Sequence, residues 1–234
     1  GVSNGPTYFQ LCMTKVLNEL LGVACEVFID DICVYGTSAE EFEANLQQVF
    51  QRLKEYNILL KPKKCKIGLT EIVYLGFVLN QDGIKLSEER KESIQTISIP
   101  TNVRKLRSFL GVCNYFREFI PKFSIIIKSL TELLEKNAKW EWSLAANQAF
   151  NQIKELMSSS SLLYHIDYDL PIVVRVDASR LGVGAVLLNI DRGEEKIIQW
   201  ISKAFSGAAR NWSTIKQEAF ATVFALQKFS PYLL

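Results

Sequence analysis

Two adjacent aspartates, Asp30 and Asp31, lie in the middle of the apolar segment "EVFIDDICVY". The β-branched and aromatic residues around them predict two short strands, with the aspartates at a two-residue hairpin turn. Asp is common in turns, but the favoured two-residue turns contain glycine, and this one has none. Like charges between apolar strands need a neutralising partner. Mg²⁺ binds one or two carboxylates together with substrate phosphates, so the pair predicts part of a metal site for phosphoryl transfer.

A second pair of acidic residues, near the end of the sequence, could do similar chemistry. Asp177 ends the predicted strand "PIVVRVDAS", on the face opposite to Val174 and Val176. Glu218 lies one turn into a predicted helix that starts with a capping box at Thr214. An aspartate that ends a strand before a turn is common, so Asp177 alone is a weak signal.

The composition narrows the class of protein. The chain has 234 residues, 48% of them hydrophobic, and a formal charge of +2, which neither demands nor excludes a polyanionic partner. Five cysteines without a C-x-x-C pair and a single histidine exclude a His-rich metal site and favour reduced intracellular thiols. No apolar run approaches the roughly 20 residues that span a bilayer, and no signal pattern opens the chain. We therefore expect an intracellular protein without a membrane partner.

The elements that position the acidic residues follow from the apolar periodicity. In the first part we expect a helix before the aspartate hairpin and a second helix after it, which starts with a capping box of Ser38 and Glu41. The segment "IVYLGFVLNQDGIKLS" predicts two strands joined by a turn at Asp82-Gly83. These elements indicate helices packed on short antiparallel sheets.

The rest of the chain changes character twice. From Ser87 to about Met157 the periodicity is helical, with breaks at Pro100 and Pro121. The serine run at 158–161 and the following "DYDLP" predict a linker. Three consecutive strands and a helix from Ser213 come next. The whole pattern predicts an α+β fold with more than one domain.

Six segments of the sequence belong together in this order: "GVSNGPTYFQ", "FIDDICVYG", "YLGFVLNQDGIKLS", "LRSFLGVCNYFREFIPKFS", "VDASRLGVGAVL" and "NWSTIKQEAFA". They resemble the reverse transcriptases of long-terminal-repeat retrotransposons of the Ty3/gypsy type. The resemblance extends over nearly the whole chain and implies an RNA-directed DNA polymerase with ribonuclease H activity, encoded in a polyprotein.

The resemblance also implies a domain organisation. Residues 1–86 would be the second half of the polymerase palm, 87–157 the thumb and connection, and 158–234 the N-terminal part of a ribonuclease H-like domain. The family's first palm aspartate, its fingers and its last two ribonuclease H carboxylates would lie outside these residues. The sequence starts without methionine and stops inside a helical pattern. We therefore expect part of a longer protein, inactive on its own.

By the same resemblance, Asp30 is the main metal ligand of the polymerase site and Asp31 supports it. Asp177 and Glu218 would be the first two of four acidic residues that hold two metals in ribonuclease H. The implied cofactor is Mg²⁺, two ions per active site of the complete enzyme, with Mn²⁺ as a substitute. The implied partners are an RNA/DNA template-primer duplex, deoxynucleoside triphosphates and the remaining polyprotein, in the cytoplasm and within a virus-like particle.

Residues of the two hairpins would contact the primer. Phe28 stands where many relatives have tyrosine, and its ring would pack near the primer end. Leu75 and Gly76 fall on the "primer grip" hairpin, where a glycine lets the backbone approach the primer closely. Ordinary sheet packing is the alternative explanation for this hairpin.

A helix around Gly111 exposes a stripe of three residues, Arg107, Gly111 and Tyr115, spaced four apart and facing away from the apolar side. A mid-helix glycine costs about 1 kcal/mol relative to alanine. In the family this helix lies in the minor groove of the duplex, where such a stripe would serve phosphate contact, close approach and stacking. A glycine needed for helix packing is the alternative. Two basic clusters could add phosphate contacts or be merely solvated; they comprise Lys61, Lys63, Lys64 and Lys66, and Arg104, Lys105 and Arg107.

Two other interpretations of the whole chain stay open: a decayed or domesticated derivative of a retroelement that binds nucleic acid or a protein without catalysis, and a structural element of a larger assembly. The presence of Asp30, Asp31, Asp177 and Glu218 favours the enzyme, because drift would not spare metal ligands at both sites.

Overall fold

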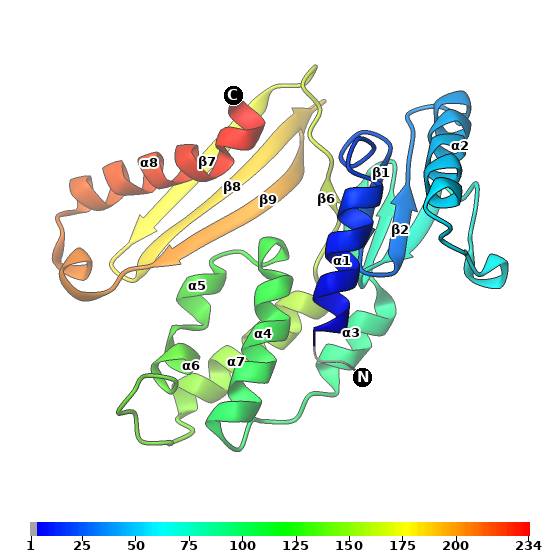
Figure 1. The fold of residues 1–234 in the computed structure, drawn as a ribbon. Coiled ribbons are helices and arrows are strands. Elements are labelled where there is room, and N and C mark those ends of the chain that lie inside the picture. The colour runs from blue at the N-terminus through cyan, green and yellow to red at the C-terminus, as the bar shows by residue number, and fades with distance from the viewer. Residues whose placement is uncertain (1–3) are drawn as a thin grey trace. The chain divides into compact units, whose positions relative to one another are not determined.

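The structure is a computed structural model that describes residues 4–234 (Figure 1). It combines helices with antiparallel sheets, which confirms the predicted α+β class. The chain forms two compact units, one that ends at Leu69 and one that spans Thr70–Leu234. The first three residues of the "GVSNGPTYFQ" segment lie outside the described part. The predicted domain boundaries after residues 86 and 157 stay predictions.

The first unit is a helix, a hairpin and a second helix, as predicted. Its apolar core comes from both helices and includes Met13, Leu17, Val49 and Leu53. Ser38 caps the second helix by accepting from the Glu41 N–H at 3.2 Å, which confirms the predicted start. The elements are α1 (Gly5–Val16), β1 (Cys25–Phe28), β2 (Asp31–Val34), α2 (Ala39–Glu55) and the short 3₁₀ helix η1 (Pro62–Lys64).

The second unit begins with a four-stranded antiparallel sheet of order β3-β4-β5-β6. The prediction of only two strands over this stretch was wrong, because Leu75 and Gly76 form a second tight turn between β3 and β4. The predicted linker contains β6, whose Tyr164 pairs with Gly83 of β5. The strands are β3 (Glu71–Tyr74), β4 (Phe77–Asn80), β5 (Gly83–Leu86) and β6 (Leu163–Tyr164).

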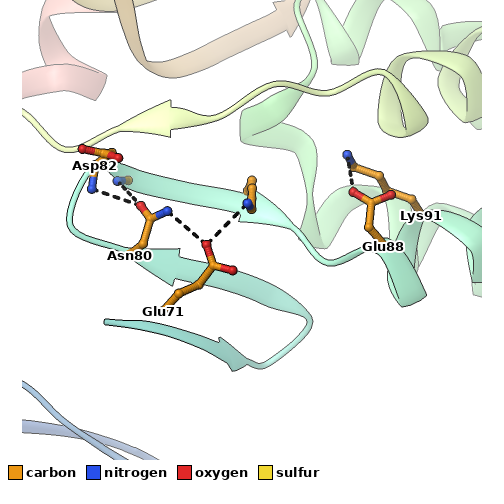
Figure 2. A network of polar contacts seen from close by, with 7 residues as sticks. Glu71, Asn80, Asp82, Glu88 and Lys91 are labelled. Atoms are coloured by element: carbon orange, nitrogen blue, oxygen red, sulfur yellow. Dashed lines mark hydrogen bonds and ion pairs between the residues drawn. The ribbon is translucent and has the colours of Figure 1, made fainter. Parts of the chain in front are cut away.

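A polar network fixes the register of this sheet (Figure 2). Asn80 Oδ1 accepts from the N–H groups of Asp82 (3.0 Å) and Gly83 (3.1 Å), which shapes the β4–β5 turn. The Asn80 amide also donates to Glu71 at 3.2 Å, and Glu71 pairs with Lys85 at 3.5 Å. These contacts tie β3, β4 and β5 together at the end of the β3–β4 hairpin that lies opposite the Leu75-Gly76 turn.

Helices follow the sheet and share one hydrophobic core with it. The core is centred on the inner face of α4 and on α7, with Leu106, Phe109, Phe150 and Ile153 among its buried members. The helices are α3 (Glu88–Gln95), α4 (Val103–Tyr115), η2 (Arg117–Phe119), α5 (Phe123–Ile126), α6 (Lys128–Glu132) and α7 (Leu144–Ser158).

The last part of the second unit is a three-stranded antiparallel sheet of order β7-β8-β9, with α8 along it (Figure 1). The three strands and the helix confirm the predicted order. The helix is capped by Ser213, whose Oγ accepts from the Lys216 N–H, so the predicted cap at Thr214 was one residue late. The elements are β7 (Ile172–Ser179), β8 (Gly182–Asp191), β9 (Glu194–Ala204), η3 (Gly207–Asn211) and α8 (Thr214–Leu233).

None of the helices in the described part of the chain combines the length and the apolar character that crossing a membrane requires.

Candidate functional site

The aspartate hairpin forms, but its turn is shifted by one residue from the prediction. Phe28 pairs with Asp31 in the register of β1 and β2, so the two-residue turn consists of Ile29 and Asp30. Asp31 is therefore the first residue of β2 rather than a turn residue. Phe28, Asp30 and Asp31 are all solvent-exposed. The hairpin thus presents two carboxylates and an aromatic ring together at one tip.

The turn is strained, and a glutamine from α1 holds it. Ile29 has φ +55°, a conformation that β-branched residues rarely adopt. The Ile29 N–H donates to Gln10 Oε1, and Gln10 Nε2 donates to the Val27 carbonyl at 3.2 Å. Strained residues of this kind cluster at functional sites. Sequence reasoning missed Gln10, because its hydrogen-bond partners lie 17 and 19 residues further along the chain.

Two cysteines flank the hairpin and stay protonated at neutral pH. Burial, followed by the nearby charge of Glu26 and by Cys33, raises the pKa of the Cys25 thiol to about 11. Burial and then Glu26 also raise the pKa of Cys33. A thiol rather than a thiolate is a poor nucleophile and metal ligand. The carboxylates are therefore the ligands that this hairpin offers.

The second hairpin also has a strained turn. Leu75 (φ +54°) and Gly76 (φ +88°) both have positive φ, and leucine is unusual there. The Tyr115 hydroxyl donates to the Leu75 carbonyl at 3.4 Å, and the Ser87 N–H donates to the Gly76 carbonyl at 3.1 Å. Three of the predicted nucleic-acid contacts, from a hairpin and a helix, therefore lie together.

The ring of Tyr115 is packed as well as bonded. Its centroid lies 5.3 Å from that of Phe77, the first residue of β4, and 4.8 Å from that of Phe116. Tyr115 is 52% exposed, so one side of it remains open to solvent. The contacts fasten the end of α4 to the Leu75-Gly76 turn.

Helix α4 has one buried and one exposed face, as the sequence predicts. Its inner face is buried, whereas Arg107, Gly111 and Tyr115 are exposed along the outer face. A Cβ added to Gly111 would meet no atom within 4 Å in the described part of the chain. Helix packing within this part therefore does not require the glycine, and the bare backbone is free for an external partner. The buried residues are Leu106, Phe109, Leu110, Cys113 and Phe116.

Asp177 and Glu218, the two acidic residues of the last segment, share no partner within the part of the chain that the structure describes. The face of β7 that carries Val174 and Val176 packs on α8, so Asp177 lies on the opposite face. There its carboxylate forms an ion pair with Lys122 Nζ at 2.5 Å. Glu218 is exposed on α8, and its backbone carbonyl accepts from Thr222.

Lys122 was not predicted as part of any site. It precedes α5 with φ +54°, and its side chain lies 3.1 Å from where a Cβ on Gly184 would be. The neighbouring Ser124 donates from its N–H to Ser202 Oγ at 2.8 Å and from its hydroxyl to the Ser202 carbonyl at 3.0 Å. These bonds dock α5 on the sheet and place the lysine at Asp177.

The two carboxylate sites differ in how well they suit a divalent metal. Asp30 and Asp31 offer exposed oxygen ligands of the kind Mg²⁺ takes. At Asp177 the ammonium group of Lys122 occupies the position that a metal cation would need. While this ion pair is present, the Asp177 carboxylate does not fit a metal ion. In residues 4–234, no group of three or more His, Cys, Asp or Glu side chains could hold a metal ion.

Two models of known protein families match the two ends of the chain. Residues 1–79 match the family model described as reverse transcriptase (RNA-dependent DNA polymerase), and residues 142–234 match the RNase H-like domain found in reverse transcriptase. The retrovirus-related Pol polyprotein from transposon 297 of Drosophila melanogaster is 35% identical over 235 residues, which cover 100% of the chain. The chain belongs to the reverse transcriptase and RNase H region of retrotransposon Pol polyproteins. This confirms the family that the sequence motifs indicated.

Other members of this reverse transcriptase family are similarly related. The Transposon Tf2-3 polyprotein of Schizosaccharomyces pombe is 30% identical over 234 residues and the whole chain. The chain spans only 22% of the transposon 297 polyprotein and 18% of the Tf2-3 polyprotein. It therefore corresponds to about a fifth of these relatives.

Solved structures of reverse transcriptases share the fold. The foamy viral protease-reverse transcriptase in complex with dsDNA is 27% identical, with a TM-score of 0.78 over 98% of this chain and 48% of that one. The same viral enzyme in complex with an RNA/DNA hybrid is 28% identical, with a TM-score of 0.76 over 96% of this chain and 30% of that one.

Proposed function

We propose that this chain supplies half of a polymerase site and part of a ribonuclease H site to an RNA-directed DNA polymerase within a retroelement polyprotein. The substrates would be an RNA/DNA template-primer duplex and deoxynucleoside triphosphates. The observation that carries the proposal is the hairpin tip, where Asp30 and Asp31 stand exposed at a strained turn held by Gln10. A turn that needs a clamp and exposes two like charges has no evident structural purpose.

Asp30 and Asp31 would hold Mg²⁺, or Mn²⁺ in its place, with Asp30 as the main ligand. Bound metal ions would neutralise the phosphate charge and lower the pKa of the attacking hydroxyl. The protein's own part is to hold the carboxylates in place: Gln10 fixes the Ile29-Asp30 turn, and the pairing of Phe28 with Asp31 fixes the strand that follows. Two carboxylates hold a pair of hard cations poorly, so we propose that these 234 residues alone neither extend a primer nor cleave a hybrid.

The duplex would lie along the outer face of α4 and the Leu75-Gly76 turn. Arg107 would contact a phosphate or a base edge of the duplex. Gly111 would let the duplex approach the helix backbone closely, and Tyr115 would present the exposed side of its ring to the duplex. The open space around Gly111 and the bond from Tyr115 to Leu75 support this path. The foamy viral relatives were solved in complex with dsDNA and with an RNA/DNA hybrid.

Asp177 and Glu218 would contribute to the ribonuclease H site. Because Lys122 neutralises Asp177, this site would have to release the lysine before a metal could bind. We place the complete protein in the cytoplasm, within a virus-like particle.

Primer extension by the full-length polyprotein that contains this chain tests the proposal. Asp30→Asn should abolish DNA synthesis on an RNA template. Asp82→Asn is a matched control, because Asp82 is an exposed aspartate at another hairpin turn and, in the described part of the chain, only its backbone N–H and carbonyl are hydrogen-bonded; synthesis should persist. Undiminished synthesis by Asp30→Asn would contradict the proposal. A full-length wild-type protein that binds the duplex without synthesis or cleavage would favour the domesticated, non-catalytic alternative.

A further inference from the structure

A cavity of about 390 Å³ lies within the second unit, where strands β4–β6 face β9. Its lining comes from these strands, from η2 and from the end of α8. Much of the lining is apolar, and three of its members, Phe119, Leu163 and Ile198, are buried. Cavities of about 300–1,000 Å³ with apolar linings are typical binding sites for small molecules.

Hydrogen bonds and ring stacking fix the lining of the cavity before any ligand binds. The His165 N–H donates to the Asp82 carbonyl at 3.1 Å, and His165 Nε2 lies 3.1 Å from the Asn80 carbonyl. The rings of Phe77 and Phe119 stack with their centroids 5.8 Å apart and their planes 18° apart. Because the lining is already ordered, a ligand would lose little free energy in shaping it.

Three polar side chains of the lining are available to a ligand. Within residues 4–234, the side chains of Glu118, Gln199 and Tyr232 have no hydrogen bond or ion pair. Burial, followed by the charges of Glu118 and Tyr168, raises the pKa of the Tyr232 hydroxyl, which therefore stays protonated at neutral pH. A few polar groups in a mostly apolar cavity are what orients a bound small molecule.

The charge and the rings of the lining favour a cation. In the described part of the chain, no cation pairs with the Glu118 carboxylate. Lys196 lies 5.6 Å from the centroid of the Tyr164 ring, but it pairs with Asp191 at 2.6 Å. Aromatic faces attract cations, and a planar cation with two N–H donors can also bond a carboxylate at two points. The aromatic residues of the lining are Phe77, Phe119, Tyr164 and Tyr232.

We propose that this cavity binds a small planar aromatic cation, with its charged group at Glu118 and its ring among the aromatic and aliphatic side chains. The inference goes beyond the proposed function, because no residue of the proposed metal sites or of the proposed duplex path lines the cavity. A ligand in this place would contact strands β4–β6 and β9 at once and would hold them in one arrangement.

Titration of the 234-residue chain with benzamidine, followed by NMR of labelled isoleucine and leucine methyl groups, tests the proposal. The methyl signals of Leu79, Ile84, Ile166 and Ile198, which line the cavity, should shift. The signal of Ile215, which is exposed on α8, should not. We expect a dissociation constant of about 1 mM, as suits a ligand of this size, so the titration extends to about 10 mM.

Two comparisons test the role of the charge. Benzamide, a neutral molecule of the same shape, and the variant Glu118→Gln should each weaken binding by roughly three- to tenfold. Glu92→Gln is the matched control, because Glu92 is an exposed glutamate on α3 that does not line the cavity; it should leave benzamidine binding unchanged. The proposal is wrong if the cavity methyl signals do not shift, if benzamide binds as tightly as benzamidine, or if Glu118→Gln behaves like Glu92→Gln.

Discussion

Gln10 Oε1 accepts a hydrogen bond from the N–H of Ile29, the strained residue next to Asp30. The same amide donates to the Val27 carbonyl at 3.2 Å, so one side chain spans the end of β1 and its turn. Helix α1 thereby sets the position of the carboxylate that we propose as the main metal ligand.

Gln10→Leu should lower the free energy of unfolding of the 234-residue chain by about 1–2 kcal/mol, because the Ile29 N–H and the Val27 carbonyl lose their partner. Urea unfolding measures the loss, and amide hydrogen exchange at Ile29 should become faster. Gln51→Leu is the control, since Gln51 is exposed on α2 and, among the residues that the structure describes, its side chain bonds to Glu55 alone, at 3.0 Å. Equal effects of the two variants would show that the clamp has no special role.

Gly111→Ala should stabilise the chain by about 1 kcal/mol while weakening binding to an RNA/DNA hybrid. The gain is expected because alanine favours the helix and the site has room for a Cβ; the loss is expected because the methyl group would keep the duplex away. Thermal unfolding and fluorescence anisotropy measure the two effects. Asn114→Ala, on an exposed position of the same helix, should not weaken binding. A Gly111→Ala chain that binds as tightly as wild type would remove Gly111 from the proposed path.

Cys113 should make the chain less stable as the pH rises above 9. Burial raises the pKa of its thiol from 9.0 to about 12, so the unfolded chain releases this proton first. The stabilisation is complete below pH 9 and is lost as the pH rises toward 12, by about 1 kcal/mol between pH 8 and pH 10. Urea unfolding at the two pH values should show a smaller decrease for Cys113→Ala than for wild type. Cys65→Ala, which removes an exposed thiol, should leave the decrease unchanged; identical behaviour of the two variants would contradict the assignment.

Lys122→Met should free the carboxylate of Asp177 for a cation. An exposed ion pair contributes up to about 1 kcal/mol, so the affinity for Mn²⁺ should rise by roughly two- to fivefold. Electron paramagnetic resonance of free Mn²⁺ measures the binding. The gain should vanish when Asp177→Asn is added, and Lys128→Met, which breaks the exposed pair with Glu132, should produce none. A gain that persists without Asp177 would show that the metal binds elsewhere.

Much of the local structure follows from the sequence, because periodicity and caps report on neighbouring residues. The inner face of α4, the cap at Ser38 and the three strands from Ile172 are examples. The turn at Ile29 was misplaced because propensity favours Asp over a β-branched residue at positive φ. Tertiary contact with Gln10 overrides that preference.

The partners of the candidate sites could not be predicted, because they are distant in sequence. Gln10 and Lys122 stand in segments that look like ordinary helix starts and surfaces. Only the fold brings Lys122 to Asp177. The short strand β6 escaped notice for the same reason, since two residues carry no period and pair with a strand about 80 positions earlier.

The most direct test of the central claim measures both activities of the full-length polyprotein in parallel, with Asp30→Asn and Glu218→Gln as the two variants. Primer extension on an RNA template reports synthesis, and cleavage of the RNA strand of a hybrid reports ribonuclease H. We predict that Asp30→Asn abolishes synthesis and spares cleavage, and that Glu218→Gln does the reverse. Loss of both activities from either single change would contradict the assignment of two separate carboxylate sites.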